Sequence, residues 1–235
     1  MLSLQAVNQF YGDKHVLWNL NLDLVPGECA CVIGAPGMGK STLMNCITGH
    51  IPVHSGTMIW QPPQRCPENI LPLSAAHRSQ MGIAHLPRED RVFTQLTVEE
   101  NLQIAMLAGK PAPGAVPHHI YDLFPALHGL RHQRAAELSE ANLQQLALAR
   151  ALMTHPKLLI LDEPLRRNTP QRLADMATLL RRLTRELGIT ILMVEQHLSF
   201  IRRTADRFIL LHRGRNVAHG DISHLNTVIG DWMEP

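Results

Sequence analysis

The chain has 235 residues, and its hydrophobic share of 45% is sufficient for one sizeable core with a small appended subdomain. A formal net charge of +2 excludes the strongly basic composition of a dedicated nucleic-acid binder. No stretch reaches the roughly 18 consecutive apolar residues of a membrane-spanning helix, and residues 1–10 lack the basic and apolar regions of a secretion signal. The composition therefore predicts a globular chain that neither crosses a membrane nor is exported.

Two antiparallel strands are predicted at the start of the chain, over residues 2–7 and 16–24, because apolar and polar residues alternate there. The residues from Tyr11 to Lys14 form the turn between them. Tyr11 is a candidate for stacking on an adenine base, although an aromatic residue beside a turn often serves packing alone.

A phosphate-binding loop follows, because residues 34–42 match the pattern G-x-x-x-x-G-K-[ST]. The loop consists of Gly34, Ala35, Pro36, Gly37, Met38, Gly39, Lys40, Ser41 and Thr42. An apolar strand-like run precedes it and a helix-like run follows, which argues against a chance match in a glycine-rich turn. The helix N-terminus and the loop N–H groups favour an anion. Lys40 is expected to reach the β- and γ-phosphates of a nucleotide, and the Ser41 hydroxyl to ligate Mg²⁺.

The middle of the chain predicts two further strands separated by an irregular segment. Residues 55–60 read as a turn and a strand, and residues 81–86 as a short strand that ends at Pro87. Between them, the proline-rich residues 61–72 are expected to form a surface excursion that cannot continue a sheet.

Residues 88–155 are predicted to be mainly helical. Thr97 and Glu100 form a capping box that opens a helix. Three prolines and one glycine in residues 110–117 break that helix before another begins near His118.

A second group of polar residues follows a buried strand at residues 158–161, where Asp162 and Glu163 stand before Pro164. Asp162 is a candidate ligand of the Mg²⁺ that bridges the phosphates, and Glu163 a candidate base that orients or deprotonates a water. By itself such a pair is as often a cap as a site. Its occurrence together with the phosphate loop favours a site.

The C-terminal part predicts a helix over residues 170–187, a strand over 189–194, a helix over 198–205 and a strand over 207–212. The strand at 189–194 delivers Glu195, Gln196 and His197 to the same edge of the sheet as the acidic pair. Alternating strands and helices predict an α/β fold with a mostly parallel sheet and a ligand at the carboxyl ends of its strands.

Cysteines and histidines show no pattern of a disulfide or a metal site. The four cysteines form no C-x-x-C motif, and three of them lie in apolar runs, which predicts reduced thiols and a cytoplasmic location. The 14 histidines lack metal-ligand spacing, so we expect no metal beyond the Mg²⁺ of a nucleotide.

The order of these motifs resembles the ATP-binding subunit of ABC transporters over essentially the whole chain. The residues that carry the resemblance are Tyr11, the loop at 34–42, Leu138-Ser139 with residues 144–152, and residues 158–164. Finer matches at residues 91–93, 96–102, 123–125 and 194–196 are similar to the subgroup that serves branched-chain amino acid and urea importers. Short matches at residues 8–12, at residues 27–29 and at Ser55-Gly56 with Trp60 lean toward the urea members.

The resemblance implies an ABC ATPase fold: a P-loop NTPase core with an antiparallel β subdomain and a helical subdomain. It implies a single ATP-binding domain over residues 1–235, with the core and the β subdomain at 1–87 and 156–235 and the helical subdomain at 88–155. ATP and Mg²⁺ are the implied cofactors. The implied nucleotide contacts are Tyr11, the phosphate loop, Asp162 and Ser139.

The resemblance also implies an assembly. Two ATP-binding subunits, identical or different, would meet head to tail, so that each ATP lies between one phosphate loop and the other chain's signature Leu-Ser-Gly-Gly-Gln. Ser139 belongs to that signature and would contact the ATP of the second subunit. Transmembrane permease subunits would dock near residues 88–102, and a periplasmic solute-binding protein would take part indirectly. The implied location is peripheral, on the cytoplasmic face of the plasma membrane.

The sequence departs from this family at the signature, which reads Leu138-Ser139-Glu140-Ala141-Asn142. A carboxylate within about 4 Å of a phosphate charge costs on the order of 4 kcal/mol at an effective dielectric near 20, more than the roughly 0.3 to 1 kcal/mol that Glu140 gains from its own helix dipole. We therefore expect a weakened composite site.

Three other positions differ from the family pattern. Arg88 stands where the family usually has Gln or Glu, and residues 165–169 replace a small glycine-containing loop. Gln196 occupies the place of the switch histidine, with His197 one residue later. The candidate catalytic residues are Glu163, Gln196 and Arg88. The roles of Arg88 and His197 stay open.

The leading hypothesis is an ATPase subunit of an importer, for urea. Two alternatives stay open: a branched-chain amino acid importer subunit, and a nucleotide-binding scaffold that hydrolyses little. A different phosphate-loop enzyme, such as a GTPase or a small-molecule kinase, is disfavoured because no Asn-Lys-x-Asp guanine motif is present.

Overall fold

Two β-sheets organise the chain, whose computed structural model describes residues 1–88, 92–109, 115–164 and 169–232. Within these residues the strands are β1 (Leu2–Tyr11), β2 (Lys14–Leu24), β3 (Cys29–Ile33), β4 (Ser55–Trp60), β5 (Glu68–Asn69), β6 (Ile83–Leu86), β7 (Leu158–Asp162), β8 (Thr190–Val194), β9 (Arg207–His212) and β10 (Arg215–Asp221). The helices are α1 (Lys40–Thr48), α2 (Ala75–Gln80), α3 (Val98–Gly109), α4 (His118–Leu123), α5 (Pro125–Gly129), α6 (Glu140–Leu152), α7 (Pro170–Arg185), α8 (Leu198–Thr204) and α9 (Leu225–Trp232), with short 3-10 turns at Ala135–Glu137 and Ile222–His224.

The larger sheet has the strand order β10-β9-β3-β8-β7-β6. Its neighbouring strands from β9 to β6 are parallel, and β10 pairs antiparallel with β9. Every residue of β3, β7 and β8 is buried. Continuous apolar runs are typical of parallel strands that are covered on both faces, which explains why these strands could be read from the sequence.

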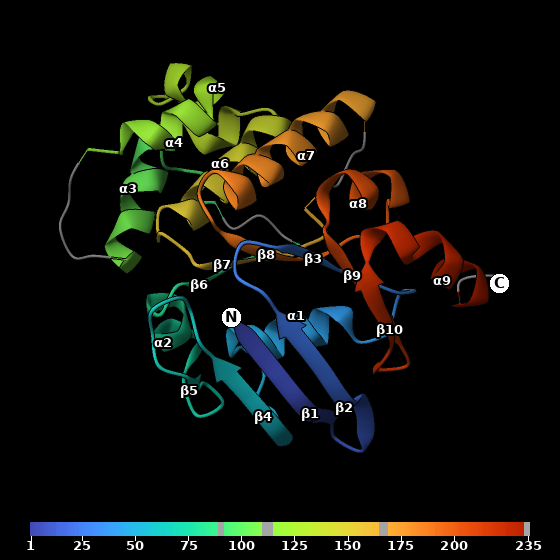
Figure 1. Ribbon diagram of the computed structural model, residues 1–235. Coiled ribbons are helices and arrows are strands. Elements are labelled where there is room, and N and C mark those ends of the chain that lie inside the picture. Colours follow the sequence, from blue (N-terminus) through green and yellow to red (C-terminus); the bar gives the residue numbers. More distant parts are fainter. Residues whose placement is uncertain (89–91, 110–114, 165–168, 233–235) are drawn as a thin grey trace.

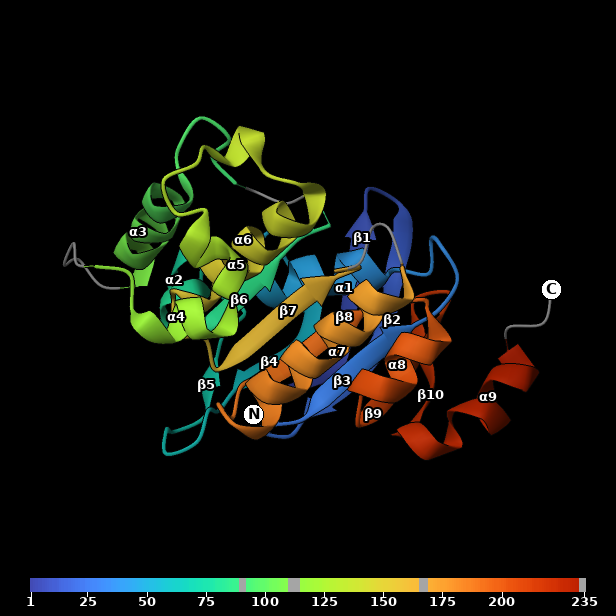
Figure 2. The ribbon, with the colours of Figure 1, turned by 90° about the horizontal axis from the view of Figure 1, so that it is seen from above.

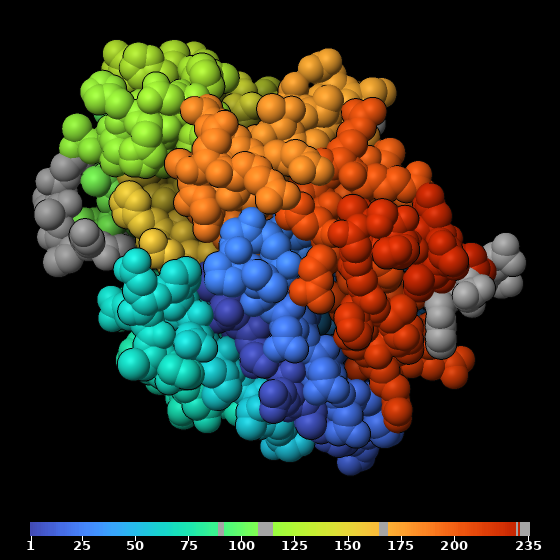
Figure 3. All heavy atoms as spheres, viewed as in Figure 1, coloured from blue at the N-terminus to red at the C-terminus, as the bar shows by residue number. Residues whose placement is uncertain are grey.

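Different layers cover the two faces of this sheet (Figure 1). Helices α3 to α8 lie over one face, and α1 with the antiparallel sheet β2-β1-β4-β5 lies over the other. Side chains alternate accordingly along β3, since Cys31 belongs to the core under the helices and Val32 to the core shared with α1. Figure 2 shows α7 and α8 lying over the sheet. In the space-filling view the N-terminal strands lie between the β4 region and the C-terminal part of the chain (Figure 3).

Helix α1, which begins in the phosphate loop, is anchored at its C-terminal end by a buried arginine of α2. Arg78 is 3% exposed, and its Nη1 donates to the carbonyl oxygens of Cys46 at 2.7 Å and Ile47 at 2.9 Å. The same guanidinium donates to Leu73 O at 3.1 Å and Leu71 O at 3.2 Å. The last carbonyls of a helix have no partner within it. Cys46 O also accepts from the Gly49 N–H at 3.3 Å, so Arg78 adds a second donor there and supplies the donor for Ile47 O.

The structure confirms the predicted α/β class and the strand before each motif. The residues from 88 to 155 that it describes contain α3, α4, α5 and α6, as the sequence indicated. Several boundaries differ by two or more residues. β1 continues to Tyr11 and β2 begins at Lys14, whereas β6 begins at Ile83 and the predicted helix at 170–187 ends at Arg185. The predictions for residue 91, for residues 110–114 and for residues 165–168 lie outside the described residues.

One prediction was wrong. The proline-rich residues 61–72 do continue a sheet, because β5 pairs with β4 through Asn69 and Glu68. Prolines occupy positions 62, 63, 67 and 72, so the four residues between the last two keep the N–H groups that a strand requires. Helices α2 and α9 and strand β10 were not predicted.

The cysteines are free, with Cys29, Cys31 and Cys46 buried and Cys66 exposed. Burial raises the pKa of Cys46 to about 12, so this thiol stays protonated at neutral pH. Among the described residues, no helix combines the length and the apolar character that crossing a bilayer requires.

We predict that Arg78→Leu lowers the free energy of unfolding by about 3 kcal/mol, because buried carbonyls that lose their donor cost about 1 to 3 kcal/mol each and relaxation recovers part of that cost. Urea denaturation followed by circular dichroism measures the change. Arg65→Leu, which removes an exposed arginine, serves as the control and should stay within about 0.5 kcal/mol of the parent. Equal losses in the two variants would contradict the anchoring role of Arg78.

Candidate functional site

Four neighbouring parallel strands, β3, β8, β7 and β6, end at one edge of the larger sheet. Strand β8 pairs with both β3 and β7 near Val194, where Val194 lies opposite Val32 and Asp162. On the other side of β7, Leu161 pairs with Leu86 of β6. The loops that follow these strands therefore meet.

A cleft of about 610 Å³ lies at this edge. Its lining residues are Tyr11, Lys14, His15, Val16, Trp18, Pro36, Gly37, Met38, Gly39, Lys40, Ser41, Thr42, Arg88, Glu163, Gln196, Arg213 and Gly214. The structure thus brings together the predicted adenine-stacking residue, most of the phosphate loop and the three candidate catalytic residues.

The phosphate loop closes around its own lysine. The Lys40 ammonium donates to the carbonyl oxygens of Gly34 at 2.6 Å and Ala35 at 2.8 Å. Burial lowers the pKa of Lys40, while the carboxylates of Glu163 and Asp162 oppose that shift. Gly34 allows the close packing that this loop needs, since a Cβ there would lie 2.3 Å from the carbonyl oxygen of Leu211.

Asp162 and Ser41 fit the magnesium role that the sequence predicts. Asp162 is 8% exposed, and among the described residues no donor reaches its Oδ1. Burial raises the pKa of Asp162, and the Ser41 hydroxyl is the first of the groups that oppose this rise. A buried carboxylate oxygen without a donor, close to a hydroxyl, is a set of oxygen ligands suited to Mg²⁺. These two residues would hold the ion, which would neutralise phosphate charge.

Glu163 lies at the centre of the predicted catalytic residues. Its backbone has φ of 49°, and its N–H donates to Val194 O at 3.0 Å. Its carboxylate accepts a hydrogen bond from Gln196 Nε2 at 2.9 Å and forms an ion pair with Arg88. Burial raises the pKa of Glu163, but the hydrogen bonds from Arg88 and Gln196 outweigh it, and the net shift is downward. The carboxylate is therefore held ionised.

A second buried carboxylate is Glu195, which the sequence reasoning placed at this edge of the sheet without giving it a role. Glu195 is 2% exposed, and its Oε1 accepts hydrogen bonds from the backbone N–H groups of Gln196 at 2.7 Å and His197 at 3.2 Å. The same oxygen lies 3.0 Å from Nδ1 of His197. Glu195 thus fixes the turn that presents Gln196 to the cleft. The available signal was an acidic residue directly after a buried apolar strand, as at Asp162.

The other end of the cleft is aromatic. Tyr11 is 48% exposed at the end of β1. Beside it, His15 stacks between Phe10 and Trp18, with ring centroids 3.9 Å and 3.6 Å apart, and the Arg215 guanidinium lies 5.1 Å above Trp18. The sequence reasoning singled out Tyr11 alone at this end of the cleft. The Arg215 contact, which it did not predict, joins β2 to the distant strand β10.

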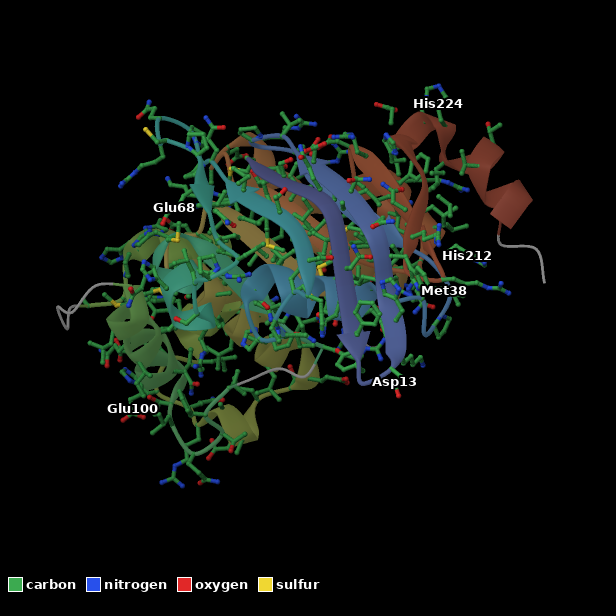
Figure 4. All side chains as sticks on the ribbon, turned by 90° about the horizontal axis from the view of Figure 1, so that it is seen from below. Asp13, Met38, Glu68, Glu100, His212 and His224 are labelled. Carbon is green, nitrogen blue, oxygen red and sulfur yellow. The ribbon has the colours of Figure 1, made fainter. Side chains whose placement is uncertain are left out.

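Backbone hydrogen bonds connect this aromatic end to the phosphate loop. Trp18 N–H donates to Gly214 O at 2.9 Å, and Gly214 N–H donates to Met38 O at 3.1 Å. Figure 4 shows Asp13, in the β1–β2 turn, on the same side of the molecule as Met38. A ligand in the cleft would therefore contact both segments.

Ser139 is the predicted nucleotide contact that lies apart from the cleft. It caps α6, where its hydroxyl accepts a hydrogen bond from the Asn142 N–H at 3.3 Å. None of the residues from Leu138 to Asn142 lines the cleft. A role for Ser139 at the nucleotide of a second subunit stays a prediction.

Known proteins are similar to this chain over most of its length. A sequence profile described as ABC transporter matches residues 17–166. The high-affinity branched-chain amino acid transport ATP-binding protein BraG of Pseudomonas aeruginosa is 35% identical over 93% of this chain and 92% of its own length. The probable branched-chain amino acid transport ATP-binding protein LivF of Archaeoglobus fulgidus is 34% identical over 96% of this chain and 94% of its own.

Solved structures share the fold. The ADP conformation of MJ1267, described as an ATP-binding cassette of an ABC transporter, superposes with a TM-score of 0.86 at 24% identity. The match covers 98% of this chain and 95% of that one. The predicted ABC ATPase fold is therefore confirmed.

We predict that Lys40→Ala weakens the binding of Mg-ATP by about 10- to 100-fold, because a charged hydrogen bond to phosphate contributes about 1.5 to 3 kcal/mol. Isothermal titration calorimetry on the isolated chain measures the affinity. Lys14→Ala removes a lysine from the rim of the same cleft and should change the affinity less than about threefold. Unchanged affinity in Lys40→Ala would overturn the assignment of the phosphate site.

Proposed function

The chain belongs to the ABC transporter family as an ATP-binding protein, and from this premise we propose that it is the ATPase subunit of an importer for branched-chain amino acids. The observation that carries the proposal is the 35% identity with BraG across nearly the full length of both chains. The sequence motifs led us to expect urea as the solute. The relatives support the branched-chain amino acid alternative better.

The cleft supplies residues for each step of ATP hydrolysis in this proposal. Tyr11 stacks on the adenine, and Lys40 with the loop N–H groups binds the phosphates. Ser41 and Asp162 hold Mg²⁺. Glu163 takes the proton of the attacking water as general base, and Gln196 orients the carboxylate through its 2.9 Å hydrogen bond.

Permease subunits are the proposed partners, and α3 with the segment before it is their proposed docking surface. Phe93, Ile104 and Leu107 are large apolar side chains exposed there. The buried side chain of Asn101 holds this segment in place. It accepts a hydrogen bond from the Phe93 N–H and donates one to the Phe93 carbonyl oxygen. Its Oδ1 also accepts a hydrogen bond from Arg150 at 2.6 Å. The surface is therefore firmly positioned relative to α6, which carries Arg150. In this arrangement the chain is peripheral on the cytoplasmic face of the membrane.

A nucleotide-binding scaffold with little hydrolysis is the second candidate, and the altered signature favours it. Glu140 is exposed at the first position of α6, directly after Ser139. In a head-to-tail pair its carboxylate would face the partner's phosphates, where repulsion costs on the order of 4 kcal/mol. The intact Lys40, Asp162 and Glu163 favour the active subunit.

Uptake by cells that lack this chain tests the proposed solute. We expect loss of uptake of radiolabelled leucine, isoleucine and valine, restored by the parent gene and not by Lys40→Ala, because the variant loses its phosphate contact. Uptake of labelled urea serves as the control and should be unchanged. Loss of urea uptake with normal leucine uptake would contradict the proposed solute and support the urea alternative.

A heterodimer with an ATP-binding subunit of intact signature should have two unequal sites. Glu163→Gln in this chain should remove most hydrolysis, since this chain's phosphate loop faces the intact signature. The matching change in the partner should cost little, because that site faces Glu140-Ala141-Asn142 and lacks close donors. Single-turnover measurements compare the two. Equal losses would rule out the asymmetry, and negligible hydrolysis in every assembly would favour the scaffold.

A further inference from the structure

Arg88 and Glu163 are held opposite each other by neighbouring parallel strands. Strand β6 pairs with β7 in a register that sets Leu86 beside Leu161. Each residue of the ion pair lies two positions further along its chain. The strand register therefore brings the two side chains together. Gln196 donates a hydrogen bond to the other carboxylate oxygen of Glu163.

The ion pair is accessible from the cleft. The side chain of Arg88 is 59% exposed and that of Glu163 is 21% exposed. Ion pairs with this exposure contribute little to stability, so a competing anion can displace one partner at small cost. Both residues line the cleft that contains Lys40 and the phosphate loop.

A guanidinium can bind either of the two anions expected in this cleft. Its planar fork of N–H donors matches a carboxylate and a phosphate equally well in shape. A terminal phosphate carries more negative charge than one carboxylate and therefore attracts the guanidinium more strongly. A glutamine at this position would carry no charge and would form no ion pair with either anion.

We propose that Arg88 is a positioning residue that exchanges between Glu163 and the terminal phosphate of a nucleoside triphosphate. In the nucleotide-free chain it holds the carboxylate of Glu163. When a triphosphate is bound it turns to the terminal phosphate, and Glu163 keeps its hydrogen bond from Gln196. A diphosphate leaves the ion pair intact. The inference rests on the proposed ATP site and adds that Glu163 competes with ATP for Arg88.

A double-mutant cycle on the isolated chain tests this exchange. The parent, Arg88→Gln, Glu163→Gln and the double variant are titrated with Mg-ATP and with Mg-ADP by calorimetry. Glu163→Gln removes the competing carboxylate and should tighten ATP binding by about fivefold, whereas Arg88→Gln should weaken it by about tenfold, each with ADP affinity unchanged. In the Arg88→Gln background, Glu163→Gln should bring no gain.

If Glu163 only repels the phosphate, the double-mutant cycle gives a different result. The gain from Glu163→Gln would then persist or grow without Arg88, and this result would overturn the inference, as would equal changes for ATP and ADP. Arg213→Gln removes another arginine of the cleft and should leave the gain from Glu163→Gln intact. A parent chain that binds no Mg-ATP would overturn the proposed function as well. If the parent binds Mg-ATP but the effects of Arg88→Gln and Glu163→Gln on its affinity simply add, the exchange alone is overturned.

Discussion

The parallel register of β3, β8, β7 and β6 is the constraint on which the site depends. The side chains of β3, β7 and β8 are buried on both faces, so these strands cannot slide relative to each other without exposing apolar surface. Each strand ends at the same edge and delivers one chemical group: the phosphate loop, Gln196, the pair Asp162 and Glu163, and Arg88. The charges of the cleft are thus placed by hydrophobic packing rather than by their own attraction.

The phosphate loop is additionally held from two directions. Arg78 anchors the far end of α1, while Gly214 connects Met38 to the β1–β2 hairpin through backbone hydrogen bonds. The aromatic end of the cleft is consequently in fixed relation to the phosphate end. A nucleotide that bridges both ends would meet a largely preformed site, which lowers the ordering cost of binding.

Sequence reasoning found the parts of the site that are local. The phosphate loop and Asp162-Glu163 each follow a continuous apolar run, and both the motif and the run are short. The ion pair of Arg88 with Glu163 and the contact of Arg215 with Trp18 were missed because they join segments distant in sequence. The role of Glu195 was missed because it depends on the geometry of a turn. Strand β5 was missed because only four residues separate two prolines. A nucleotide site does not contact the transported solute, so these motifs do not decide between urea and a branched-chain amino acid.

The most direct test is a crystal structure of the chain with Mg²⁺ and a non-hydrolysable ATP analogue. We expect the adenine on Tyr11, the ion between Ser41 and Asp162, and the Arg88 guanidinium on the terminal phosphate, with Glu163 still bonded to Gln196. An analogue bound in the cleft with Arg88 still paired to Glu163 would contradict the exchange. An analogue bound away from the carboxyl ends of these parallel strands would contradict the whole account of the site.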